Sequence, residues 1–314
     1  MDWNEQRLGR NLKLRDLSVL LTVARCGSMG KAAAELAVSQ PAISKAIAEM
    51  EFTLGVRLLD RGPQGVEPTI YARALLDRGL IAFDELRQAV KHIEYLADPA
   101  AGELRIGCAV VIGTCFGAMV VEELSRRHPG IVFHVLAAQS DVIYRALEER
   151  KVDLVIVRLF RPFAEEHMHA EVLYDEQEVV VAGAQNPWVR RRKIALADLM
   201  NEAWTLPPPD SLNGELVVEA FSDRGLDLPR MTVITSSVPV RNTLLATGRF
   251  LSIVPASVFR FPASHPGLKR LPIELPTTRR SIAIITLKNR TLNPVAQIFI
   301  DCARKLVKPL TKGL

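Results

Sequence analysis

The segment Ser28–Glu49, SMGKAAAELAVSQPAISKAIAE, decides the fold of the first part of the chain. Ser28 precedes an alanine-rich run with helical spacing, and Ser39 precedes a second run with Pro41 in its first turn. A serine hydroxyl at such a position can accept a hydrogen bond from a free backbone N–H, and proline is tolerated in the first turn of a helix. The segment therefore predicts two short helices with a break at Val38.

The second predicted helix has an inward and an outward side. Ile43, Ile47 and Met50 are spaced by four and three, so they face the interior and leave polar side chains outside. Polar side chains near the start of a helix can reach base edges or phosphates in the major groove of DNA. The alternative is an ordinary helical hairpin with solvated polar residues. The candidate DNA-binding residues are Lys31, Ser39, Gln40, Pro41, Ser44, Lys45, Arg57 and Arg61.

Two flanking segments favour the DNA-binding interpretation. Residues 14–24 have an amphipathic pattern that predicts a third helix able to cover the other two. Residues 55–68 consist of two short extended pieces around Gly62-Pro-Gln-Gly65, which predicts a hairpin. A hairpin beside a helix-turn-helix forms a wing, and Arg57 and Arg61 flank it as candidates to contact phosphates or the minor groove.

A long helical pattern begins after Thr69 and ends near Ala97. Its apolar residues alternate in spacing between four and three, which is a heptad seam. A helix of roughly 40 Å suits a dimer strut, and a helix packed on its own domain is the alternative. A dimer would present two DNA-binding helices to a two-fold-related site. The candidate dimerisation residues are Leu76, Phe83, Leu86, Val90 and Ile93.

From residue 103 onward, strand patterns alternate with helix patterns. This alternation predicts mostly parallel sheets covered by helices. Two lobes are expected, about 103–181 with 281–310 and about 182–280, and the two chain crossings between them predict a hinged clamp. The predicted strands are 104–111, 131–137, 153–158, 178–182, 203–207, 231–235, 251–255, 269–273 and 281–287, and the predicted helices of the first lobe are 114–127, 140–150 and 294–307.

Ligands of open α/β sheets bind beyond the carboxyl ends of the strands, where helix N-termini present unpaired N–H groups. For each serine on its own, a plain helix cap is the alternative. Arg158 is the candidate to bind a carboxylate or phosphate with two nitrogens, so we expect an organic acid or a sugar-derived anion as ligand. The candidate effector-binding residues are Ala109, Val110, Thr114, Gln139, Ser140, Arg158, Leu159, Ser211, Ser236, Ser237 and Val238.

The chain resembles LysR-type transcriptional regulators from about residue 13 to its C-terminus. The residues that carry the resemblance are Ala32-Ala33, Leu36, Ser39–Ser44, Ile47, Glu51, Leu54-Gly55 and Arg61. Residues 236–242 and 286–296 are similar to the galactose-binding-protein-regulator branch. Two positions depart from the family: Leu59 stands where Phe is frequent in the wing, and Ala46 replaces a frequently polar residue.

The resemblance implies an α plus α/β architecture. It places a winged helix-turn-helix at 13–70, with the motif itself at 30–49, and a linker and dimerisation helix at 69–97. A two-lobed effector domain, similar to periplasmic binding proteins, follows at 103–310. The resemblance also implies a homodimer or homotetramer that binds double-stranded promoter DNA and changes transcription when a small-molecule effector binds. RNA polymerase is a further candidate partner.

Composition adds limited information. The chain has 314 residues, 48% of them hydrophobic, which is enough for two or more domains. Its net charge of +5 is compatible with nucleic-acid binding, but the DNA prediction depends on the pattern above rather than on charge. Nothing near Met1 resembles a signal peptide, and no apolar run reaches the length of a membrane span. We therefore expect a cytoplasmic protein without membrane contact.

The motifs of common enzyme classes are missing from the sequence. It has no P-loop, no Gly-x-Ser-x-Gly and no Gly-x-Gly-x-x-Gly, so we expect no enzymatic activity and no cofactor. His167 and His169 lack the further ligands of a metal site. The rival classes are an α/β enzyme with a regulatory head and a solute-binding protein. We expect the cysteines to be reduced thiols, and a redox switch through Cys108 and Cys115 is the alternative. The cysteines are Cys26, Cys108, Cys115 and Cys302.

Overall fold

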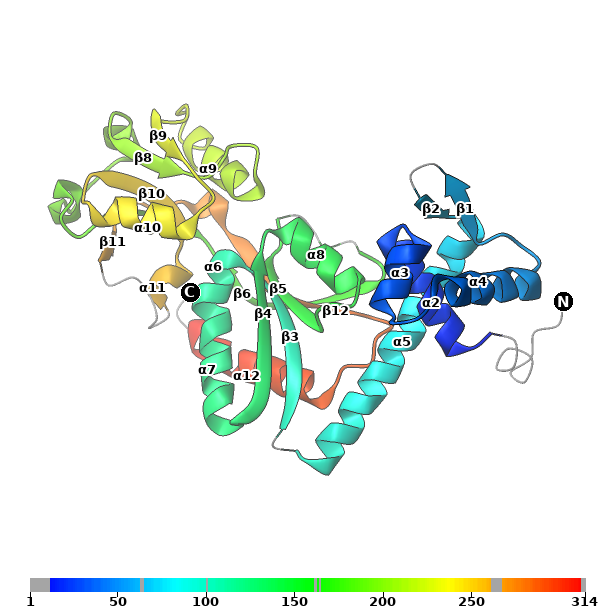
Figure 1. The fold of residues 1–314 in the computed structure, drawn as a ribbon. Helices are drawn as coiled ribbons and strands as arrows, with labels where there is room; N and C mark the ends of the chain where they lie inside the picture. The colour runs from blue at the N-terminus through cyan, green and yellow to red at the C-terminus, as the bar shows by residue number, and fades with distance from the viewer. Residues whose placement is uncertain are drawn as a thin grey trace. The chain divides into compact units, whose positions relative to one another are not determined.

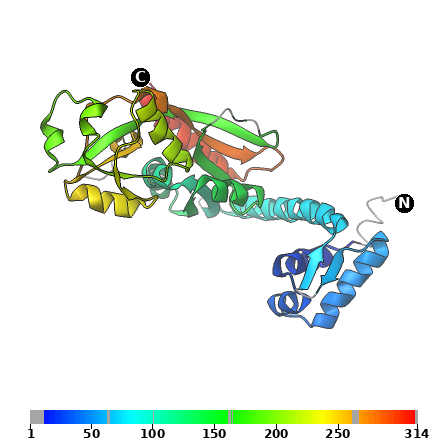
Figure 2. The ribbon, with the colours of Figure 1, turned by 90° about the horizontal axis from the view of Figure 1, so that it is seen from above.

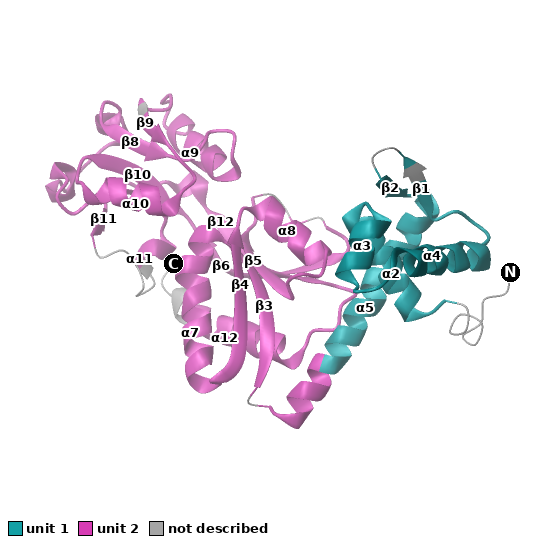
Figure 3. Cartoon of the chain, in the orientation of Figure 1, with its two compact units in different colours: residues 1–90 teal, residues 91–314 magenta. Residues whose placement is uncertain are grey.

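The computed structural model describes residues 12–62, 65–99, 101–160, 163, 165–260 and 267–311. The chain divides into two compact units, residues 1–90 and 91–314 (Figure 3). The boundary lies inside the long helix α5 (Ile70–Ala97) rather than after it. Within the described ranges, no helix combines the length and the apolar character needed to cross a membrane.

The first unit begins with three helices, α2 (Leu14–Cys26), α3 (Met29–Glu35) and α4 (Gln40–Leu54) (Figure 1). The two predicted caps are present. Ser28 Oγ accepts a hydrogen bond from the backbone N of the third residue after it, and Ser39 Oγ does the same at the start of α4. Gly27 and Gly55 end α2 and α4 with φ of 61° and 71°, a conformation that only glycine adopts without strain.

The core of the first unit lies between these helices. As predicted, Ile43, Ile47 and Met50 of α4 are buried, and they pack with α2 residues such as Leu20. Ala32 of α3 is completely buried, and its small side chain permits the close approach of neighbouring helices. The helical phase read from the sequence therefore fixes which side of α4 remains outside.

The predicted hairpin consists of β1 (Leu59–Gly62) and β2 (Gly65–Pro68), which pair antiparallel. The carboxylate of Glu51 accepts hydrogen bonds from the backbone N of Leu58 at 2.7 Å and of Leu59 at 3.2 Å, which fixes the hairpin to the end of α4. At Gly65, with φ of 130°, a Cβ atom would lie 2.3 Å from the carbonyl oxygen of Gly27. Only glycine therefore permits this contact between hairpin and α2.

Helix α5 is a single unbroken helix (Figure 2). The hydroxyl of Thr69 caps it by accepting from the backbone N of Ala72 at 3.2 Å, and the same hydroxyl donates to the carbonyl of Arg57 at 2.8 Å. Its first turns belong to the core of the first unit, where Ala72 is fully buried. At Gly79 a Cβ atom would lie 2.9 Å from the side chain of Leu17, so the glycine allows α2 and α5 to pack closely.

The second unit contains two lobes, each built on a five-stranded sheet. In lobe I the strand order is β4-β3-β5-β12-β6, with β3, β4 and β5 parallel and β12 antiparallel to both β5 and β6. Its strands are β3 (Ala101–Ala109), β4 (Gly130–Ala138), β5 (Leu154–Arg158), β6 (Met168–Glu176) and β12 (Arg280–Leu287). Its helices are α6 (Val110–Ile112), a π-helical turn (Gly113–Gly117), α7 (Ala118–Arg127), α8 (Ser140–Glu148) and α12 (Pro294–Thr311).

Lobe II has the strand order β11-β7-β10-β8-β9, in which β8 pairs parallel with β9 and β10. Trp204 is completely buried in its core and packs edge-on against Phe221 at 5.6 Å. Its strands are β7 (Glu178–Gly183), β8 (Ala203–Leu206), β9 (Met231–Ile234), β10 (Phe250–Pro255) and β11 (Leu268–Arg270). Its helices are α9 (Leu212–Ser222), α10 (Val238–Ala246) and α11 (Ser257–Arg260), with short 3-10 turns at Pro187–Arg190, Leu196–Leu199 and Pro276–Thr278.

All nine predicted strands of the second unit have an observed counterpart, and one observed strand, β6, is additional. Two predicted bounds were wrong, because residues 110–111 already belong to α6 and residues 271–273 lie beyond the end of β11. The prediction missed β6 because charged residues interrupt its apolar pattern: Glu171 and Asp175 lie among Val172, Leu173 and Tyr174. The strand lies at the edge of the lobe I sheet next to β12, and its Glu171 pairs with Arg304 of α12 at 2.6 Å.

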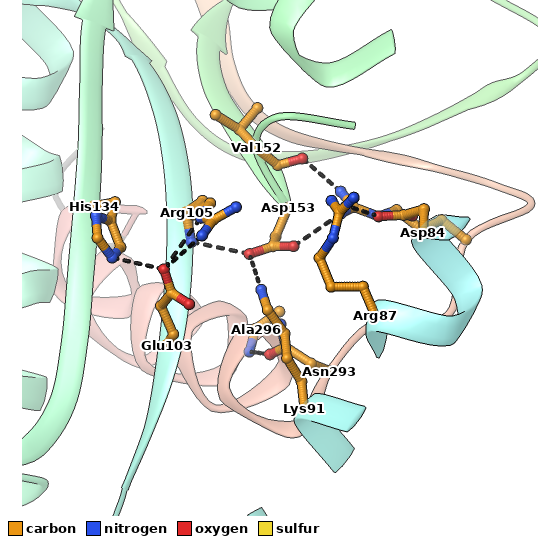
Figure 4. A network of polar contacts seen from close by, with 11 residues as sticks. Asp84, Arg87, Lys91, Glu103, Arg105, His134, Val152, Asp153, Asn293 and Ala296 are labelled. Atoms are coloured by element: carbon orange, nitrogen blue, oxygen red, sulfur yellow. Dashed lines mark hydrogen bonds and ion pairs between the residues drawn. The ribbon is translucent and has the colours of Figure 1, made fainter. Parts of the chain in front are cut away.

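Charged side chains join elements of lobe I (Figure 4): Asp153 is buried, whereas Glu103, Arg105 and His134 are partly exposed. The carboxylate of Asp153, 3% exposed, accepts from the backbone N of Arg105 at 2.9 Å and pairs with Arg290 at 3.0 Å and Lys91 at 3.4 Å. Glu103 pairs with Arg105 at 2.8 Å and with His134 at 2.7 Å. These contacts connect strands β3, β4 and β5 with the segment before α12.

Candidate functional site

The start of α4 presents polar side chains that the fold leaves open. Gln40 and Pro41 are exposed, and the side chain of Lys45 is 78% exposed. Lys45 Nζ lies 3.8 Å from Glu49 one turn later, and such an exposed pair on a helix is weak. Gln40 and Lys45 are therefore available to an external partner. Ser39 supplies the cap described above and is itself exposed.

The other candidate DNA contacts differ in their surroundings. Lys31 on α3 and Arg57 before β1 are exposed. Ser44 is half-buried, and its hydroxyl donates to the sulfur of Met29 at 3.3 Å, so this side chain connects α3 and α4 instead of pointing freely outward. Arg61 lies on β1, but its side chain falls outside the described part of the chain.

The predicted seam on α5 has two parts. Leu76 is half-buried and packs in the core of the first unit, and Phe83 is also half-buried. Further along, Leu86, Val90 and Ile93 are 48%, 53% and 65% exposed. Large apolar side chains with this exposure, repeated along one helix, form a surface that another protein chain can cover. The predicted dimerisation role is thus compatible with the second half of the seam.

A cavity of about 380 Å³ lies in the second unit where segments of both lobes meet. Lobe I contributes the junction of β3 and α6, the start of α8 and the end of β5. Lobe II contributes the start of α9, α10 and residues near β10. Eight of the candidate effector-binding residues line it: Ala109, Val110, Gln139, Ser140, Arg158, Ser211, Ser236 and Val238.

The other three candidates do not line this cavity. Thr114 donates its hydroxyl hydrogen to the carbonyl of Val111 at 2.9 Å, inside the helical segment after β3. Ser237 caps α10 by accepting from the backbone N of Val240 at 3.4 Å, and Leu159 packs on the core around α8. For Ser237 the helix-cap alternative therefore describes the observed contact, and the hydroxyl of Thr114 bonds within its own helical segment.

Arg158 occupies a buried ion-pair cluster. Its side chain is 5% exposed, and its guanidinium bonds Glu178 at 2.5 Å and Glu176 at 3.3 Å. Burial alone would lower the pKa of Arg158, but the two carboxylates raise it overall, so the side chain is firmly charged. Only Nε of this buried group has no hydrogen-bond partner among the described residues. Protein carboxylates thus already take up most of the donors that the sequence assigned to a ligand.

This cluster lies at the hinge between the lobes. Glu176 ends β6 in lobe I, and Glu178 begins β7 in lobe II. The backbone N of Glu178 donates to Thr278 Oγ1 at 2.9 Å, which links the two chain crossings, and the backbone N of Ser257 donates to Glu176 at 2.7 Å. The pKa of Glu178 is raised by its burial and by Glu176, against the lowering effect of Arg158.

Sequence reasoning missed Arg241 of α10, which also lines the cavity. Its Nε is buried without a hydrogen-bond partner among the described residues. Burial lowers the pKa of Arg241, although the charge of Glu178 acts in the opposite direction. A cation one turn after the Ser237 cap was visible in the sequence, but only the fold shows that it faces the cavity. Acidic residues that were also missed are Asp141, Glu178 and Asp210.

Among the described residues, the thiols share a raised pKa. Burial raises the pKa of Cys108 to about 11, and the pKa values of Cys26, Cys115 and Cys302 are raised as well. In the part of the chain that the structure describes, no group of three or more His, Cys, Asp or Glu side chains is arranged to hold a metal ion. His167 and His169 are both exposed.

Comparison with known proteins identifies both units. Residues 14–73 match the model of the bacterial regulatory helix-turn-helix protein, lysR family, and residues 97–308 match the LysR substrate binding domain. The chain is 26% identical over 304 residues to the HTH-type transcriptional regulator GbpR of Azospirillum brasilense, covering 95% of this chain and 87% of GbpR. It is 25% identical to TdcA of Escherichia coli K12, covering 93% of each protein.

Solved structures share the fold. A full-length OxyR variant from Pseudomonas aeruginosa superimposes with a TM-score of 0.67 at 23% identity, covering 93% of this chain and 95% of OxyR. Full-length CbnR in complex with its target DNA superimposes with a TM-score of 0.64 at 22% identity, covering 94% of this chain and 99% of CbnR. Since the two family models together span most of the chain, the protein belongs to the LysR family of DNA-binding transcriptional regulators.

Proposed function

We propose that the protein acts as a dimer that places two copies of α4 on promoter DNA and changes transcription when a small anionic effector binds between its lobes. The observation that carries this proposal is the exposed start of α4, where Gln40 is exposed and Lys45 has only a weak pair with Glu49, in a unit that matches the lysR helix-turn-helix model. CbnR, which has the same fold, has been crystallised on its target DNA.

DNA binding is tested by a gel-shift titration with the DNA upstream of the protein's own gene. We expect Gln40→Ala to weaken specific binding by roughly tenfold, since one good side-chain contact to a base contributes about 1–3 kcal/mol. We expect Lys45→Ala to lower the slope of log affinity against log salt by about 0.9 if Lys45 contacts one phosphate. Ser44→Ala is a poor test because it also removes the contact with Met29.

A matched control is Lys269→Ala, which removes an exposed lysine from lobe II. It should leave both affinity and salt slope unchanged. If Gln40→Ala and Lys45→Ala also bind like the wild type, α4 does not contact DNA and the proposal is wrong.

The dimer is tested on the second half of the α5 seam. Val90 and Ile93 are more than half exposed, and an apolar surface of this kind is stabilised when a second chain covers it. We expect Val90→Asp with Ile93→Asp to shift the dimer to monomer in sedimentation experiments, because charges would have to be buried in the contact. His92→Asp, at an exposed position outside the seam, is the control. An unchanged dimer in the double variant would exclude α5 as the dimer contact.

The family assignment disfavours the two rival classes considered from the sequence, an α/β enzyme with a regulatory domain and a solute-binding protein. Neither has a use for a capped DNA-binding helix with free polar side chains. Specific DNA binding that depends on Gln40 would exclude both as complete descriptions of the protein.

A further inference from the structure

The cavity between the lobes contains two arginines in different situations. Arg158 already has Glu176 and Glu178 as bonded partners. Arg241 is half-buried, and its Nε lacks a hydrogen-bond partner among the described residues. A guanidinium that is partly desolvated and incompletely bonded is more stable when an anion binds it. A ligand acid at Arg158 has to compete with two protein carboxylates, whereas Arg241 has donors to offer.

Glu178 lies on the same cavity wall and carries the opposing charge. It bonds Arg158, and its charge partly opposes the lowering of the Arg241 pKa that burial causes. The attraction of Arg241 would therefore stabilise a bound anion, and the repulsion by Glu178 would destabilise it. The affinity of the cavity for an anion depends on the difference between these two effects.

The rest of the polar wall favours a ligand that also donates hydrogen bonds. Asp141 at the start of α8 and Asp210 before α9 both line the cavity, and an ionised carboxylate only accepts hydrogen bonds. Hydroxyl groups on the ligand would satisfy these oxygens, and Gln139 and Ser140 offer further partners. The lining thus matches a molecule with one acid end and a hydroxylated body.

Resting on the function proposed above, we propose that Arg241 binds the acid group of a small hydroxycarboxylate and that Glu178 weakens this binding by repulsion. Arg241 belongs to lobe II, whereas Gln139, Ser140 and Asp141 belong to lobe I. A ligand that contacts both sets of residues holds the lobes together. Since Glu178 also bonds Arg158 at the hinge, the charge of the ligand acts on the pair of residues that joins the lobes.

The test is calorimetric titration of the full chain with gluconate, malate and citrate at constant ionic strength, with glucose as the uncharged counterpart of gluconate. We expect at least one acid to bind with a Kd of about 1 mM or tighter and glucose not to bind. Arg241→Gln should lower the affinity for that acid by roughly 10- to 100-fold, the range expected for hydrogen bonds to a charged group. Arg241→Lys should retain part of the affinity because it keeps the charge but loses the planar fork.

Glu178→Gln should have the opposite effect and raise the affinity of the protein for that acid severalfold. Opposite effects from two neighbouring positions distinguish ligand contact from general damage to the lobe. Arg249→Gln is the charge-matched control, because Arg249 is exposed, packs over the ring of Phe250 and does not line the cavity. It should leave the affinity unchanged.

Several results would overturn the proposal. They are an acid whose affinity is unchanged in Arg241→Gln, a neutral sugar that binds as well as the acid, and unchanged or weaker acid binding in Glu178→Gln. Failure of all three acids to bind also overturns it. If the wild type still binds its promoter specifically in these cases, only the ligand assignment fails and the proposed regulatory function stands. If Arg241→Gln does not fold, the result for Glu178→Gln decides.

Discussion

The start of α4 and the cavity between the lobes use polar side chains in contrasting ways. On α4, Gln40 and Lys45 are exposed and have at most a weak partner, so their arrangement follows from helix phase alone. In the second unit, Arg158 and Asp153 are buried and bonded to residues that are distant in the sequence. The comparison teaches that exposed polar groups such as Gln40 and Lys45 stay available to an external partner, whereas a buried charge is first of all part of the fold.

The largest expected effect tests the buried side of this comparison. Asp153→Ala leaves Arg290 and Lys91 without their shared carboxylate and frees the backbone N of Arg105. Breaking a buried ion pair by removing one partner lowers the free energy of unfolding by roughly 3–5 kcal/mol. Denaturant unfolding measures this, with Asp223→Ala as control, since the side chain of Asp223 is 39% exposed and 3.9 Å from Arg224. A loss below that of the control would show that the cluster in Figure 4 is not structural.

The next effect tests the first unit, where contacts are local. Glu51→Ala removes the acceptor for two backbone N–H groups at the start of the hairpin, and we expect a loss of about 1–3 kcal/mol. Glu49→Ala, two residues earlier on the same helix, removes only the exposed pair with Lys45 and should change unfolding by well under about 1 kcal/mol. Equal losses in the two variants would contradict the proposed anchoring of the wing by Glu51.

A smaller effect is expected from a change of pH, which tests how the charge of Glu178 acts on a bound acid. The pKa of Glu178 is raised by burial and by Glu176, against Arg158, and Arg241 faces it from α10. It therefore takes up a proton at a higher pH than an ordinary glutamate. As the pH falls below neutral, its repulsion of a bound acid decreases, and the affinity of any acid that stays ionised should rise a fewfold. The Glu178→Gln variant should lack this rise in affinity. A wild-type affinity that does not change with pH would contradict the predicted repulsion by Glu178.

The smallest effect is expected from the thiols. The pKa of Cys108 is raised to about 11, and the pKa of Cys115 is raised by the same cause, burial, so neither is a thiolate at neutral pH. Diamide treatment should leave DNA affinity unchanged in gel-shift titrations, with mass spectrometry reporting modification first at the less buried Cys26. A disulfide between Cys108 and Cys115 accompanied by altered DNA affinity would instead support the redox alternative.

Much of the fold was predictable because its elements are specified locally. The caps at Ser28, Ser39 and Thr69 and the spacing of Ile43 and Ile47 fix where the helices begin and which side is buried. Strand β6 was missed because charged residues interrupt its apolar pattern, and a single segment does not show the pairing of Glu171 with Arg304 of α12. The helical phase of α4 predicts an outward position for Ser44. The structure differs because Ser44 contacts Met29 of another helix, and the spacing within α4 does not show that contact.

The cavity could be predicted only in outline. The strand ends and helix starts that form its walls follow from the βα pattern, and most of the candidate residues do line it. Which charges remain free does not follow from that pattern, because the sequence shows neither the carboxylates that bond Arg158 nor that Arg241 faces the cavity. Their difference arises from Glu176 and Glu178, which lie about 20 residues after the first arginine and about 60 before the second.

The sequence by itself determined the helix-turn-helix, the long helix and the alternating strands of two lobes, since caps, turn glycines and apolar periodicity act between near neighbours. Only the tertiary structure decided that Arg158 is bonded within the protein while Arg241 still has donors available. Electrostatic pairing depends on distances across the folded chain, and burial makes that pairing strong enough to determine which charges a ligand can reach.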